Sequence, residues 1–96
     1  MENVSIHVID EFFRILLPQK LRGQIGWEVG ASLVAVANLA EKAIVLSSEK
    51  DGKLVIDDLG RIKLPKALAS DLGWSVKDRF SVTLNAEAGA IVLSLV

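Results

Sequence analysis

The chain is 96 residues long, has no cysteine, and carries eleven basic and twelve acidic residues, for a formal net charge of −1. This length allows one small domain, and the lack of cysteine excludes disulfides and thiolate metal sites. Because the net charge is near zero, any nucleic-acid-binding face has to be a local concentration of basic residues. Hydrophobic residues make up 51% of the chain and are mostly aliphatic, which favours a β-rich core and makes a homodimer attractive.

The apolar periodicity predicts two similar series of elements, each with two strands, a short helix and two further strands. In the first series Val4, Ile6 and Val8 alternate with polar residues, as in a half-buried strand. Pro18 ends a strand and begins a helix, which Gly26 ends. A single helix over residues 9–25 is disfavoured, because Pro18 in its interior would cost about 3 kcal/mol. The predicted strands are 4–8, 14–17, 32–37, 43–48, 53–56, 61–64, 79–85 and 90–95, and the predicted helices are 19–25 and 65–72.

The sequence repeats itself with an offset of 47 residues. Residues 8–49 align with residues 55–96 without a gap, and 17 of the 42 aligned pairs are identical. A repeated unit of this size cannot bury its apolar face alone, so the two copies are expected to close one core between them. Runs of consecutive apolar residues in the strands leave no solvent face, which favours a closed barrel. We predict one domain over residues 1–96, with repeats 4–49 and 53–96 and a polar linker at 48–52.

One segment of the second copy carries a recognisable pattern. Between Ile56 and Leu68, Asp57 and Arg61 form an Asp-x-x-x-Arg motif that is followed by aliphatic residues, Pro65 and a short helix. This pattern resembles the AbrB/SpoVT/MazE family of swapped-hairpin barrels. The tandem arrangement resembles that of the MraZ proteins, which also repeat the motif.

The resemblance implies a closed swapped-hairpin β-barrel with two short helices, mainly β, formed by both repeats of the chain. In single-copy members of the family, two chains exchange hairpins to complete such a barrel. The first copy departs from the pattern, because Phe13 stands where the family usually has Gly. A double-psi β-barrel, whose halves have a similar order of elements, remains the alternative.

The resemblance also implies a transcriptional regulator that binds double-stranded DNA. Arg14 and Arg61 match the Arg of the motif, and Arg22 matches a helix position that is often basic. An Asp four residues before an Arg also has a purely structural interpretation, in which it holds the Arg in a turn. The candidate DNA-binding residues are Arg14, Lys20, Arg22, Arg61, Lys63 and Lys66.

A second hypothesis is an interaction module that has kept the barrel and lost DNA binding, with a toxin-like protein as partner or a role in assembly. Phe12 and Phe13 favour it, because a turn does not need two aromatic residues. One of them is expected to plug the end of the barrel and the other to form part of a partner surface. Trp27 and Trp74 occupy equivalent positions and are expected to pack in the core.

The sequence shows no nucleophile–base constellation, no phosphate-binding Gly loop and no nucleotide-cofactor motif, so we expect neither an enzyme nor a cofactor. His7 has no second His or Cys with which to hold a metal. The start Met1-Glu2-Asn3 lacks the features of a signal peptide, and the mild apolar run 31–40 is half the length of a membrane span. We expect a cytoplasmic protein without membrane contact.

Overall fold

The structure, a computed structural model, describes residues 4–96 and is mainly β with two short helices, as predicted. Residues 1–3, on which the prediction about the N-terminus rests, lie outside the described residues. None of the helices within 4–96 has the length and apolar character to cross a membrane. The elements are β1 (Val4–Val8), β2 (Arg14–Leu16), α1 (Gln19–Gln24), β3 (Ser32–Asn38), β4 (Ala43–Ser48), β5 (Leu54–Val55), β6 (Arg61–Lys63), α2 (Lys66–Leu72), β7 (Arg79–Asn85) and β8 (Ala90–Leu95).

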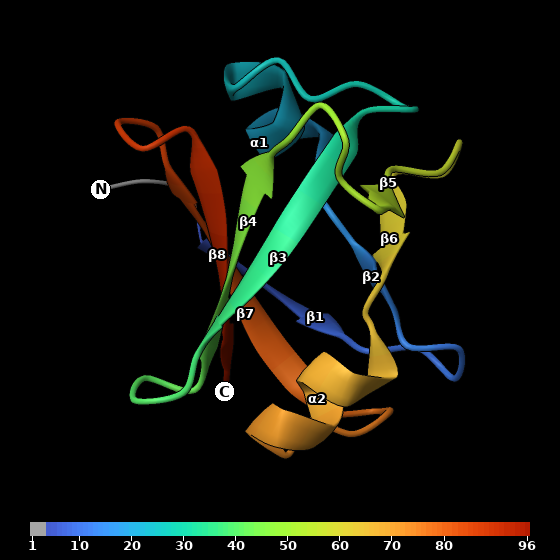
Figure 1. The fold of residues 1–96 in the computed structure, drawn as a ribbon, viewed down its shortest axis with the longest axis vertical. Helices are drawn as coiled ribbons and strands as arrows, with labels where there is room; N and C mark the ends of the chain where they lie inside the picture. Colours follow the sequence, from blue (N-terminus) through green and yellow to red (C-terminus); the bar gives the residue numbers. More distant parts are fainter. Residues whose placement is uncertain (1–3) are drawn as a thin grey trace.

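The strands form a curled six-stranded sheet and a separate two-stranded ribbon (Figure 1). The order in the large sheet is β1-β7-β8-β4-β3-β5, and the ribbon consists of β2 and β6. All of these pairs are antiparallel. The helices α1 and α2 lie at opposite ends of the molecule, at the top and bottom of Figure 1.

Most strand pairs join residues from different halves of the chain. β1 of the first half pairs with β7 of the second, β5 of the second pairs with β3 of the first, and β4 pairs with β8. The ribbon also takes one strand from each half. Only the hairpins β3–β4 and β7–β8 lie within one half. Folding of either half therefore depends on strands that the other supplies.

The curled sheet is joined to the ribbon at two equivalent turns. The Asp10 N–H donates to the Arg14 oxygen at 3.1 Å, and the Asp57 N–H donates to the Arg61 oxygen at 2.8 Å. Beyond these turns, no backbone hydrogen bond between β1 and β2 or between β5 and β6 is found in the described part of the chain. The sheet is thus a half-barrel, and full closure remains a prediction.

The core lies between the sheet, the ribbon and the helices. Phe80 is fully buried and stacks on Trp74, with ring centroids 6.4 Å apart. Trp27 is buried as well, so both tryptophans pack in the core. Each helix follows a proline, and Gly73 ends α2 in the left-handed conformation, at φ 73°.

Two apolar side chains of the first strand, Ile6 and Val8, lie on the outside. Ile6 and Val8 are 51% and 50% exposed, whereas Ser5 and His7 are half-buried. This differs from the usual reading of an alternating strand, in which the apolar residues face the core. The cause is Ile9, which directly follows the strand and is fully buried. Because side chains alternate between the two faces of a strand, His7 also faces inward, beside Phe80.

Candidate nucleic-acid interface

Each Asp-x-x-x-Arg motif forms a turn that its own aspartate holds together. Asp10 Oδ1 accepts the N–H groups of Phe12 and Arg14, both at 2.8 Å, and Asp10 Oδ2 accepts Arg14 Nε at 2.8 Å. Asp57 accepts the corresponding bonds from Leu59 and Arg61 at 2.8–3.0 Å. The aspartate therefore has the structural role that the sequence left open, and it also fixes the direction of the arginine.

These bonds change the acidity of both aspartates. Partial burial acts to raise the pKa of Asp10, but the hydrogen bonds from Arg14 and Phe12 and the charge of Arg14 outweigh it and lower the pKa. The pKa of Asp57 is lowered in the same way, by Arg61 and Leu59 against the effect of burial. Both turns are therefore set up for ionised carboxylates at neutral pH.

The arginines keep part of their guanidinium groups accessible. The Arg14 and Arg61 side chains are 32% and 26% exposed, and each uses Nε for its aspartate. Within residues 4–96, their terminal nitrogens have no recorded hydrogen bond. The Arg14 guanidinium lies 4.8 Å from the ring centroid of Phe12, a cation–π contact that further fixes its orientation.

The ribbon gathers three of the predicted cations on its outer face. Arg14 is the register partner of Lys63, and Arg61 is the partner of Leu16. The central residues Ile15 and Ile62 are buried, so the residues on either side of them point outward. The ribbon thus presents Arg14, Arg61 and Lys63 together.

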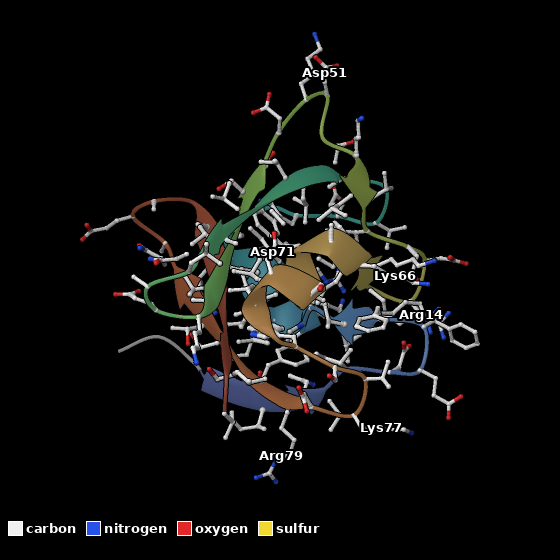
Figure 2. All side chains as sticks on the ribbon, turned by 60° about the horizontal axis from the view of Figure 1, so that its bottom comes forward. Arg14, Asp51, Lys66, Asp71, Lys77 and Arg79 are labelled. Carbon is white, nitrogen blue, oxygen red and sulfur yellow. The ribbon has the colours of Figure 1, made fainter. Side chains whose placement is uncertain are left out.

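A groove beside the ribbon adds two lysines to this group. It has a volume of about 370 Å³ and is lined by Lys53, Lys63, Lys66, Leu54, Val55, Leu64 and Pro65. Figure 2 shows Lys66 and Arg14 on the same side of the molecule, whereas Arg79 lies at the bottom of the view. We call Arg14, Arg61, Lys53, Lys63 and Lys66 the basic face. Among residues 4–96, the charged residues that line the groove are all lysines, which concentrates positive charge there.

Lys53 was not among the predicted site residues. The family pattern often has basic residues in the strand before the motif, and the positions that match them here are Leu54 and Val55. Lys53 lies one residue earlier. Its membership in the groove depends on how β5 runs past β6, which spacing along the sequence does not give.

The two remaining predicted cations lie on α1. Arg22 donates from Nε to the Leu17 oxygen at 2.8 Å and from Nη1 to the Trp27 oxygen at 3.5 Å. It also lies against Gly60, where an added Cβ would be 2.8 Å from Arg22 Nη2. Arg22 therefore ties α1 to the second turn. Lys20 is exposed on the same helix.

The two phenylalanines have different surroundings. Phe12 is 62% exposed at the tip of its turn, and the equivalent Leu59 is 65% exposed. Phe13 packs against the core and lines a pocket of about 440 Å³ together with Ala69 and Trp74. Among the described residues, Trp74 Nε1 is the one buried side-chain polar atom without a hydrogen-bond partner.

The region equivalent to the basic groove, on the other half of the chain, has no lysine. Moving back 47 positions replaces Lys53, Lys63 and Lys66 with Ile6, Leu16 and Gln19. Ile6 and Leu16 are 51% and 42% exposed. The two halves thus share a backbone plan but have surfaces of different chemistry.

A scan against protein-family models finds no match, and no curated protein matches the sequence.

Proposed function

We propose that the protein is a DNA-binding transcriptional regulator of the AbrB/SpoVT type, built as a swapped-hairpin barrel from two fused copies. The exchange of strands between the halves supports this architecture, because β1, β2, β4 and β5 all pair with strands of the other half. The observation that carries the function is the basic face. Lys53, Lys63 and Lys66 line its groove, and Arg14 and Arg61 lie beside it on the ribbon.

The basic face contacts the phosphate backbone of duplex DNA. The lysines of the groove supply mobile point charges, and Arg14 and Arg61 supply guanidinium groups that their aspartates hold in place. The terminal nitrogens of an arginine held at Nε still donate to a phosphate or to a base edge. Binding is therefore strong at low salt and weakens steeply as salt displaces the protein from phosphates.

Fluorescence anisotropy with a labelled duplex over a series of salt concentrations tests this proposal. The variant Lys53→Gln/Lys63→Gln/Lys66→Gln removes three charges from the basic face. Each lost phosphate contact lowers the slope of log affinity against log salt by about 0.9, so we expect a decrease of about 2 to 3.

A control variant removes the same charge elsewhere, with Lys42→Gln/Lys77→Gln/Arg79→Gln. We expect it to retain most of the affinity and of the salt slope. If both triple variants lose affinity equally, the basic face is not the binding site. If the unchanged protein binds no duplex at about 50 mM salt, the proposed function is wrong.

Exposed apolar turn tips favour one other function, the protein-interaction module. Phe12 and Leu59 are both more than half exposed, at equivalent positions of the two Asp-x-x-x-Arg turns. A toxin-like protein encoded beside this one is the partner to test, by purifying the two proteins together. Phe12→Ala should prevent that complex and leave the fold, measured by circular dichroism, unchanged.

A further inference from the structure

β1 and β5 are equivalent strands whose outward surfaces differ at one position, where Ile6 corresponds to Lys53. In β5 and the residue before it, Lys53 and Val55 point outward and Leu54 packs against the core. In β1, Ile6 and Val8 point outward and His7 points inward. Only the first half therefore has an outward surface of two half-exposed aliphatic residues where the second has a lysine. Such a pair of exposed apolar side chains on an end strand indicates that another molecule covers the outer face of the strand.

β1 also has an open edge for backbone pairing. It lies at the end of the six-stranded sheet, next to β7 alone. The Ile9 N–H donates to the Asp78 oxygen at 3.0 Å, and the Ile9 oxygen accepts the Lys77 N–H at 2.8 Å, so Ile9 faces β7. Backbone groups alternate in direction along an antiparallel strand. Those of Ile6 and Val8 therefore point away from β7.

We propose that β1 is a dimerisation strand, which pairs antiparallel with β1 of a second copy of this chain about a twofold axis at Ile6. The two six-stranded sheets then join edge to edge. The pairing places the outward aliphatic residues of both copies on one face of the joined sheet. The pairing does not depend on the proposed function.

The partner is a second copy because the strand is complementary to itself. Its sequence Val4-Ser5-Ile6-His7-Val8 has the same apolar–polar pattern in both directions, so antiparallel pairing aligns apolar with apolar positions. The strand itself has no Lys, Arg, Asp or Glu, so no like charges face each other between the two copies of residues 4–8. The other edge of the sheet is short and has Lys53 beside it, a known way of blocking such pairing.

The buried area sets the expected strength. Ile6 and Val8 are each about half exposed. Two copies of two such side chains cover roughly 200 Å² of apolar surface, since full burial of one removes roughly 100 Å². Even when the paired backbone is included, the total buried area stays below about 1,200 Å², the lower limit for stable complexes. We therefore expect a weak dimer that forms as concentration rises.

Sedimentation velocity of the full chain without nucleic acid tests the pairing. Between about 5 and 500 µM, the mass should rise from 10.4 kDa towards twice that value. Val8→Lys should weaken the dimer at least about tenfold. The matched control is Val55→Lys, since Val55 is equivalent to Val8 and equally exposed, at 51%. It should leave the dimer unchanged.

Disulfide trapping tests the register. The chain has no cysteine, so Ile6→Cys introduces a single thiol. Residues directly opposite in an antiparallel pair have Cα atoms about 4.5–5.5 Å apart, which a disulfide spans. Mild oxidation should therefore link Ile6→Cys into a dimer, and Val55→Cys should stay largely unlinked.

Several results would overturn the proposal. One is a chain that stays at 10.4 kDa throughout the concentration range. Others are a dimer that survives Val8→Lys, equal weakening by both lysine substitutions, and equal cross-linking of both cysteine variants. Circular dichroism of Val8→Lys confirms that loss of the dimer is not loss of the fold. Because no DNA is present, failure of the proposed function leaves these outcomes unaffected.

Discussion

Within residues 4–96, three turn positions have a left-handed backbone on a residue other than glycine, and each has glycine at the equivalent position of the other copy. Phe13, Lys42 and Lys77 have φ of 59°, 53° and 74°. The equivalent residues Gly60, Gly89 and Gly30 have φ of 81°, 64° and 90°. Both copies thus keep the same backbone turn, although an L-residue there costs about 1–2 kcal/mol. The turn geometry is set by the fold and not by the local residue.

The pair Phe13 and Gly60 shows how the side chains adjust to this backbone. Gly60 lies beneath Arg22 of α1, and the equivalent pocket has Phe13 beside Ala69 of α2. Where the turn has the small Gly60, the helix has the large Arg22. Where the turn has the large Phe13, the helix has the small Ala69. The sequence marks Phe13 as unusual, but only the packing of turn against helix explains it.

Gly60→Ala should destabilise the protein by about 2–3 kcal/mol. The new Cβ is strained at φ 81° and displaces Arg22 from its backbone acceptors. Gly26→Ala is the control, because Gly26 has φ 72° but open space around it. It should cost about 1 kcal/mol. Urea unfolding measures both changes, and Arg22→Ala should reduce the cost of Gly60→Ala to that of the control.

At the scale of elements, short-range signals predicted most of the secondary structure. Pro18 and Pro65 directly precede the two helices, and Gly73 ends α2 as expected. β5 was predicted over 53–56 and has only two residues, because its pairing with β3 is limited to Ser32 and Leu33. The sequence also did not show which side chains of β1 face the core. Ile9 is buried, and this turns the alternating apolar residues before it, Ile6 and Val8, towards the outside. Partners distant in the sequence decide both features.

The two Asp-x-x-x-Arg turns predict a loss of stability in acid. The pKa values of Asp10 and Asp57 are lowered in the folded state. Their stabilising contribution is therefore complete above the unfolded pKa of about 3.9 and is lost as pH falls through the lower folded pKa. The urea concentration at the midpoint of unfolding should stay constant from about pH 7 to 5 and should decrease below about pH 4.

Replacing both aspartates tests the origin of this acid sensitivity. Asp10→Asn/Asp57→Asn should be less stable than the unchanged protein at pH 7 and should lose less stability below about pH 4. The control Glu11→Gln/Asp58→Asn removes exposed carboxylates from the same turns and should keep the original pH dependence. Parallel curves for the aspartate variant and the unchanged protein would contradict the assignment.

At the scale of the whole molecule, the repeat predicted one shared core but not how the cations are arranged. Arg14, Arg61, Lys63 and Lys66 were predicted from the motif and its surroundings, and strand pairing brings Arg14 next to Lys63. Arg22 was predicted with them, but its bonds to Leu17 and Trp27 give it a structural use. The position of an arginine in the sequence does not show whether its guanidinium group already donates hydrogen bonds within the protein.

The strand exchange predicts that neither half folds as a monomer. In a chain of residues 50–96, β5 and β6 lose all their partners, and β7 and β8 keep only each other. A two-stranded hairpin is marginally stable at best in water. We expect this fragment to be unfolded at low concentration and to gain structure only as it self-associates, measured by circular dichroism and sedimentation. A folded, cooperatively melting monomer would refute the exchange.

Because both repeats lie in one polypeptide, each contact between a turn and a helix can change by mutation without changing the other, which identical separate subunits cannot do. In a symmetric assembly of two identical subunits, both contacts have the same residues, so two first copies would place phenylalanine against arginine in each of them. Here each contact evolves by itself, and the arginine sits over a glycine in one while the aromatic ring sits beside an alanine in the other. The covalent link thus permits equivalent faces of the two repeats to differ in surface chemistry.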